Sequence, residues 1–115
     1  MVFNKGKHFN LPPLRVSWLL VDGHSDEPLQ IGVGASGKHF RKAVDRNRIK
    51  RVLREAWRLQ KIPLKQMLTQ KEKKAAVFII YTGRDLPDLD TVMSKIKEVI
   101  EKLMQLFNES DTSDT

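Results

Sequence analysis

The chain has no cysteine among its 115 residues, which excludes disulfide bonds and thiolate metal sites. It has no run of 18 apolar residues and no basic segment followed by an apolar core, as a secretory leader has. Its histidines, His8, His24 and His39, lack the spacing of metal ligands, and no carboxylate cluster completes a site. We therefore expect a cytoplasmic domain that contacts no membrane and holds no metal by itself.

Acidic residues are scarce in one part of the chain. The net charge is +7, but residues 1–74 carry 17 Lys and Arg against six Asp and Glu, whereas residues 75–115 carry four against eight. Between Lys38 and Arg54 there are eight basic residues and a single acid, Asp45. A basic patch of this density predicts an anionic partner, and first of all a nucleic acid.

The stretch from Arg46 to Arg54 and the residues just after it combine a buried and a charged helix face. The apolar residues that fall at helical spacing are Ile49, Val52, Leu53, Ala56 and Trp57. The residues that fall outside this stripe form one row of Arg46, Lys50 and Arg54 and a second row of Asn47, Arg51 and Arg58. Like charges at i, i+4 weaken a helix slightly, and an external polyanion would offset that cost.

The rest of the chain predicts a small α+β domain. β-branched and aromatic runs indicate strands over Leu14–Val21, Leu29–Ala35 and Ala75–Thr82. Apolar periodicity predicts two helices, over Arg41–Gln60 and over Leu89–Phe107. Asp88 or Asp90 is the expected N-cap of the second helix. The first of these helices stops before Pro63, and we expect Lys61–Lys74 to be a basic connector with at most one helical turn, at Leu64–Leu68. Residues 1–107 form one domain in this interpretation, and residues 108–115 form a disordered polar tail.

A family resemblance rests on several short motifs. They are Gly32-Val33-Gly34-Ala35-Ser36, Lys38, Ala43-Val44, Arg46-Asn47-Arg48-Ile49-Lys50-Arg51 and Arg54-Glu55. In this order they resemble the signature of the bacterial ribonuclease P protein subunit. The resemblance implies a ribosomal-protein-like βαβ domain whose small four-stranded sheet has helices packed on one side. It also implies a fourth strand near Lys7–Asn10 and a left-handed crossover, although the general rule favours the right hand.

The resemblance further implies a function in tRNA processing, the endonucleolytic removal of the 5′ leader from precursor tRNA. Catalysis would belong to an RNA subunit and to Mg²⁺ bound mainly by that RNA, so no protein side chain is expected to be catalytic. The expected partners are this catalytic RNA and the precursor tRNA leader, with no obligate protein partner. Two alternatives stay open: a generic RNA- or DNA-binding module without a processing role, and a protein-only nuclease.

The predicted RNA-binding residues are Lys38, Arg41, Lys42, Arg46, Asn47, Arg48, Lys50, Arg51 and Arg54. The planar guanidinium of arginine suits phosphate and bases. The family analogy puts Arg46 and Asn47 near the leader, whereas Lys50, Arg51 and Arg54 would meet the larger RNA. Arg48 could instead stabilise the fold, and the whole row could be a solvated helix face.

The resemblance also implies a second site, a leader groove on the sheet. Its expected residues are Phe3, Val16, Trp18, Gly34 and Asn47. Val16 and Trp18 share one face of their strand, and a flat aromatic there could stack an unpaired base for about 1–3 kcal/mol. Gly34 would admit the RNA strand because it has no side chain. The alternative for Trp18 is packing in the core.

Overall fold

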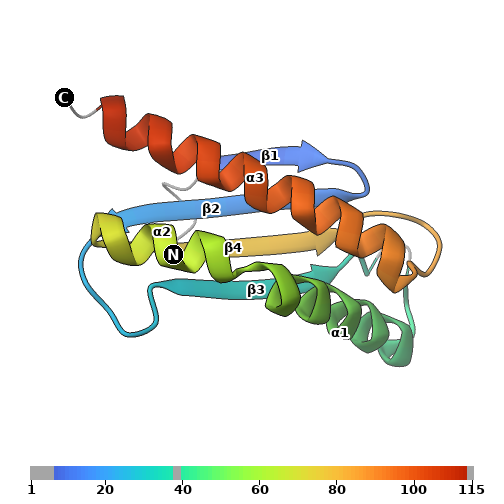
Figure 1. The fold of residues 1–115 in the computed structure, drawn as a ribbon. Helices are drawn as coiled ribbons and strands as arrows, with labels where there is room; N and C mark the ends of the chain where they lie inside the picture. The colour runs from blue at the N-terminus through green and yellow to red at the C-terminus, as the bar shows by residue number, and fades with distance from the viewer. Residues whose placement is uncertain (1–6, 38–39, 114–115) are drawn as a thin grey trace.

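The computed structural model describes the backbone of residues 7–37 and 40–113 and the side chains of these residues up to Asn108. The elements in chain order are β1 (Lys7–Leu11), β2 (Leu14–Asp22), β3 (Leu29–Ala35), α1 (Ala43–Gln60), α2 (Ile62–Lys71), β4 (Lys73–Tyr81) and α3 (Leu89–Ser113). The strands form one sheet, and all the described helices lie on the same side of it (Figure 1).

The sheet has the strand order β1-β2-β4-β3. β1 and β2 form an antiparallel hairpin, β2 is antiparallel to β4, and β3 is parallel to β4. In Figure 1, β3 and β4 point the same way, the helices that connect them lie in front, and β4 lies above β3, so the crossover is left-handed. The predicted α+β fold is confirmed, including the strand near Lys7 and the unusual hand.

The hydrophobic core lies between the helices and one face of the sheet. On β2, Val16 and Trp18 are buried, and they pair with Ile79 and Val77 of β4. The ring of Trp18 meets Phe107 of α3 edge to face, with the ring centroids 5.2 Å apart. The alternate strand residues point to the opposite face, which no described helix covers (Figure 1). We call it the open sheet face.

α1 lies against the core because its apolar residues form one stripe. Ile49, Leu53, Ala56 and Trp57 are buried, as their spacing predicts. At the end of the helix, Nε2 of Gln60 donates to a backbone carbonyl of α3 at 2.9 Å. The buried stripe fixes the rotation of α1 about its axis, and this rotation turns the basic rows away from the core.

The segment after α1 is more helical than predicted. In place of a connector with at most one turn, α2 spans ten residues, Ile62–Lys71. α1 does end at Gln60, before Pro63, as predicted, but Pro63 also occupies the first turn of α2, where its missing N–H would have no intrahelical partner. Leu64 and Leu68 are buried and anchor α2 to the core.

α3 begins at Leu89 as predicted, and Asp88 is its N-cap. The carboxylate of Asp88 accepts hydrogen bonds from the hydroxyl of Thr91 at 2.7 Å and from the backbone N–H of Thr91 at 3.3 Å. These bonds lower the pKa of the Asp88 carboxyl because they favour its charged form. The cap satisfies an amide that the first turn of a helix otherwise leaves unpaired.

The far end of α3 differs from the prediction. The helix continues to Ser113, so the disordered tail predicted from Asn108 is wrong over residues 108–113. The apolar periodicity ends at Phe107, but neither glycine nor proline follows it to stop the helix. The end of an amphipathic pattern therefore marked the end of packing on the sheet and not the end of the helix.

Candidate nucleic-acid interface

The outward side of α1 carries the two predicted polar rows together with Arg48. We call this set the basic face of α1: Arg46, Asn47, Arg48, Lys50, Arg51, Arg54 and Arg58. Arg48, Arg51 and Arg54 are exposed, whereas Arg46 and Lys50 are half-buried at the border of the core. The exposure of Arg48 favours the binding interpretation over a role in packing.

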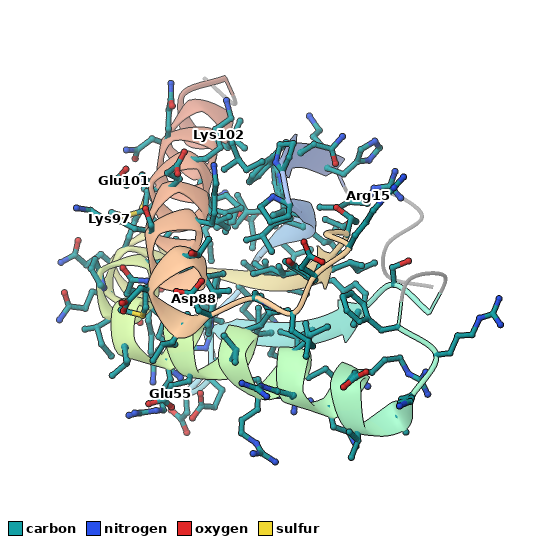
Figure 2. All side chains as sticks on the ribbon, turned by 90° about the vertical axis from the view of Figure 1, so that its right-hand side faces the viewer. Arg15, Glu55, Asp88, Lys97, Glu101 and Lys102 are labelled. Atoms are coloured by element: carbon teal, nitrogen blue, oxygen red, sulfur yellow. The ribbon has the colours of Figure 1, made fainter. Side chains whose placement is uncertain are left out.

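A groove of about 400 Å³ lies on the basic face. It is lined by Asn47, Arg51, Arg54, Glu55 and Arg58, and we call it the α1 groove. Figure 2 shows Glu55 on the underside of α1, away from α3. The structure thus gathers Asn47, Arg51 and Arg54 of the predicted RNA-binding set around one shallow depression.

Arg46 has a structural contact that the sequence did not predict. Its Nη1 donates to the backbone carbonyls of Phe40 at 2.9 Å and Arg41 at 2.6 Å. Phe40 is buried, and its ring centroid lies 6.0 Å from that of Tyr81. Arg46 therefore ties the segment that enters α1 to the first turns of the helix.

The other predicted cations lie just before α1. Arg41 and Lys42 are exposed, and Lys42 is the N-cap residue, whose side chain makes no capping hydrogen bond. Lys38 lies outside the described residues. Arg41 and Lys42 therefore extend the basic face beyond the start of the helix.

The predicted leader groove does not form as one surface. Val16 and Trp18 are 0% and 5% exposed and lie in the core, so their assignment to a groove is wrong. Gly34 lies on the opposite side of the sheet, since it pairs with Ile80 and not with a core residue of β4. Asn47 lines the α1 groove, and Phe3 lies outside the described residues. The fault was the choice of strand face, because β2 carries apolar residues on both of its faces.

The open sheet face combines an aromatic ring with two glycines and has no acidic strand residue. A Cβ added at Gly32 would lie 2.5 Å from Cδ1 of Phe78, and one added at Gly34 would lie 3.5 Å from its Cζ. The Phe78 ring thus lies over both glycines. The strand residues on this face, none of them acidic, are His8, Asn10, Arg15, Ser17, Leu19, Val21, Gln30, Gly32, Gly34, Lys74, Ala76, Phe78 and Ile80.

Three residues of these surfaces are not among the binding residues that the sequence predicts. Arg58 was placed in the second row but was not assigned to RNA, and Glu55 was treated only as part of a motif. Phe78 lies in a continuous apolar run, in which no alternation of polar and apolar residues shows which side chains belong to which face of the sheet. The register of Gly32 with Phe78, which depends on parallel pairing, is the signal that locates it.

The described residues hold no group of three or more His, Cys, Asp or Glu side chains that could bind a metal ion. None of the helices in the described ranges is long and apolar enough to cross a membrane.

Comparison with known proteins gives consistent matches. A family model described as ribonuclease P matches residues 1–104. The ribonuclease P protein component of Porphyromonas gingivalis is 40% identical over 91 residues, which cover 79% of this chain and 66% of that protein. The corresponding protein of Serratia proteamaculans is 35% identical over 74 residues, covering 64% of this chain and 53% of that protein. The chain thus matches just under two thirds of the first relative's length and about half of the second's.

The fold has a counterpart among solved structures. The structure of the Staphylococcus aureus RNase P protein matches with a TM-score of 0.64 at 17% identity, covering 89% of this chain and 84% of that one. At this identity the likeness concerns the fold, a four-stranded sheet with helices on one side.

Proposed function

Since the chain belongs to the ribonuclease P protein family, we propose that it is an RNA-binding subunit that assists a catalytic RNA in removing the 5′ leader from precursor tRNA. The partners in this proposal are the catalytic RNA and the leader of the precursor, and the place of action is the cytoplasm. Mg²⁺ held mainly by the RNA supplies the chemistry of hydrolysis. The part of this chain is to bind and orient RNA.

The observation that carries the proposal is the basic face of α1. Six of its seven residues are cationic, and Glu55 is the single acid between Arg46 and Gln60. Phosphates of a folded RNA would neutralise these cations and release counterions from the RNA. Because the buried stripe of α1 holds the face in a fixed orientation, the cations meet the RNA as an ordered surface.

The leader is assigned to the open sheet face, in place of the groove around Trp18. Gly34 adds no side chain beside the Phe78 ring, and Arg15 projects from β2 away from the helices (Figure 2). No strand residue of this face is acidic, so a single RNA strand would meet no repulsion from the strands. Arg41 and Lys42, which follow β3, could guide the strand toward α1.

The test is a cleavage assay on precursor tRNA at low Mg²⁺ with a bacterial catalytic RNA, with and without this chain. We expect faster cleavage when the chain is present, because the protein supplies cations that the RNA otherwise takes from Mg²⁺. No gain would contradict the processing role. Cleavage by the chain alone would favour the protein-only nuclease, and duplex DNA binding as tight as RNA binding would favour the generic module.

Substitution of Arg51 tests the surface itself. Arg51→Ala is expected to weaken binding to the catalytic RNA and to lower the salt slope of log K by about 0.7–0.9, the loss of one phosphate contact. Far-UV circular dichroism should show an unchanged fold, because Arg51 is exposed. Lys102→Ala on the exposed side of α3 is the matched control (Figure 2). Unchanged affinity at physiological salt for Arg51→Ala would contradict the assignment.

A further inference from the structure

The α1 groove contains an acid where an RNA-binding surface would be expected to have none. Glu55 lines the groove together with Asn47, Arg51, Arg54 and Arg58. Its side chain is 43% exposed, so burial does not force it to find a partner. An exposed carboxylate among arginines lowers the local positive potential, which opposes RNA binding. Its presence in the groove therefore has to be explained by what it does to a neighbour.

Glu55 holds Arg58 by two parallel bonds. Nε of Arg58 donates to Oε1 at 3.1 Å, and Nη2 donates to Oε2 at 2.7 Å. The pair lowers the pKa of the Glu55 carboxyl and raises that of the Arg58 guanidinium, first through the side-chain hydrogen bond. This fork-to-fork geometry fixes the guanidinium plane, which a single contact would leave free to rotate.

The chemistry of the guanidinium leaves one edge for a second anion. An arginine has five N–H donors, and the bonds to Glu55 use one on Nε and one on Nη2. The remaining Nη2 proton and one Nη1 proton point in parallel along the next edge, which matches two oxygens of a phosphate. Because Arg58 and Arg51 both line the α1 groove, one phosphate could meet both.

We propose that Glu55 is a positioning residue, which orients the guanidinium of Arg58 so that Arg58 and Arg51 together bind one RNA phosphate in the α1 groove. This inference rests on the proposed RNA-binding function of the basic face. It adds Arg58 to the binding residues and gives the one acid of the surface a role in binding. The shared ligand chemistry is a phosphodiester, whether from the catalytic RNA or from precursor tRNA.

A positioning role for Glu55 and simple charge counting predict opposite changes in RNA affinity for Glu55→Gln. Glu55→Gln raises the net charge by one, so charge counting expects tighter binding and a steeper salt slope. If Glu55 positions Arg58, the same substitution frees the guanidinium and its ordering must be supplied on binding. Immobilising a rotamer-rich side chain costs enough to weaken binding by about two- to tenfold. The salt slope should fall at the same time, as the Arg58 contact is partly lost.

The experiment measures the affinity of the full chain for a bacterial catalytic RNA and for precursor tRNA over a series of KCl concentrations. Four variants are compared with the parent chain: Glu55→Gln, Arg58→Gln, the double substitution, and Glu101→Gln. Glu101 is exposed on α3, away from the α1 groove (Figure 2), so its substitution makes the same charge change as a control. Thermal unfolding of each variant establishes that the fold is retained.

The expected pattern is specific. Glu55→Gln weakens binding, Glu101→Gln leaves it unchanged or slightly tighter, and Arg58→Gln weakens it with a slope lower by about 0.7–0.9. On the Arg58→Gln background, Glu55→Gln should weaken binding no further, because it acts through Arg58. The RNA whose affinity changes is the one whose phosphate occupies the groove.

Two results would overturn the inference. Tighter binding of Glu55→Gln, equal to that of Glu101→Gln, would show that Glu55 is only an unfavourable charge. Equal weakening by Glu55→Gln in the presence and absence of Arg58 would show that it does not act through Arg58. Failure of the parent chain to bind either RNA would instead defeat the proposed function, so the two failures are distinguishable.

Discussion

Trp18 stabilises the fold because it lies on the core face of β2. It is 5% exposed and contacts Phe107 edge to face, so its side chain joins the sheet to the last turns of α3. We expect Trp18→Ala to lower the free energy of unfolding by about 3–5 kcal/mol, the usual cost of removing a large buried aromatic.

Urea denaturation followed by circular dichroism measures this loss. Trp18→Phe, which keeps a ring against Phe107, is the matched control and should lose much less stability. A Trp18→Ala variant with an unchanged urea midpoint and a selective loss of affinity for leader-bearing tRNA would restore the groove interpretation.

Arg46 acts through two backbone carbonyls. Its bonds to Phe40 and Arg41 are each worth about 0.5–1.5 kcal/mol, so Arg46→Gln should let the segment before α1 open more often. Trypsin cleaves after Arg41 and Lys42, and proteolysis follows the open population when opening is fast. We expect cleavage there to be about tenfold faster in Arg46→Gln, as mass spectrometry of timed samples would show.

Arg48→Gln is the control for this experiment. It makes the same charge change two positions away, at an exposed residue of the same helix. Equal cleavage rates in the two variants would mean that Arg46 does not hold this segment. RNA affinity alone would not separate the two roles, because both substitutions remove a cation from the basic face.

At the scale of elements, the parallel contact between β3 and β4 distinguishes two glycines. Gly32→Ala brings a Cβ to 2.5 Å from the Phe78 ring, which must move, whereas Gly34→Ala makes only an ordinary contact at 3.5 Å. Overpacking in a core costs about 1–3 kcal/mol, and we expect the lower end here because Phe78 is half-buried on the open sheet face. We therefore expect a lower thermal midpoint for Gly32→Ala and an unchanged midpoint for Gly34→Ala.

Gly34→Ala, which should leave stability unchanged, is the variant expected to affect tRNA binding. If the leader crosses the open sheet face, Gly34→Ala should reduce the preference for precursor over mature tRNA while the fold is intact. Equal affinity ratios in Gly34→Ala and the parent chain would remove the leader from this part of the sheet. A Gly34→Ala variant that unfolds at lower temperature would show that Phe78 cannot accept even a methyl group.

The elements differ in how far the sequence could predict them. β3 was placed to the residue, and α1 within two residues, because period and flanking residues agree there. The sequence predicts only one turn of α2, because Pro63 marks the end of α1 but is equally compatible with the first turn of a new helix. The prediction of the leader groove was wrong because the sequence does not show which face of the sheet an aromatic strand residue occupies. Only the register of β2 with β4 assigns Trp18 to the core face. Glu55 and Arg58 were overlooked because their pairing concerns side-chain geometry that spacing alone does not give.

At the scale of the whole molecule, the question is whether RNA senses the net charge or the basic face. Replacing Lys50 and Arg54 by glutamine removes two cations from the basic face, and we expect the salt slope to fall by about 1.4–1.8. Replacing Lys97 and Lys102 by glutamine makes the same change in net charge on α3, on another side of the molecule (Figure 2), and should leave the slope unchanged.

The slope is measured from the affinity for the catalytic RNA between low and physiological salt. Equal decreases in the two double variants would mean that RNA binding depends on overall charge and not on an oriented surface. A decrease confined to the variant of Lys50 and Arg54 would place the phosphate contacts on α1, where the local excess of cations is greatest.

The position of β4 also constrains when the protein can fold during its synthesis. β4 pairs with both β2 and β3, yet it follows both of them in the chain. Until residue 81 is made, β3 has no strand beside it and the apolar side of β2 is uncovered. The ring of Phe107 reaches Trp18 only after that. Nascent chains therefore carry exposed strands until β4 has been made, which is the interval in which chaperones and premature RNA contacts would act on them.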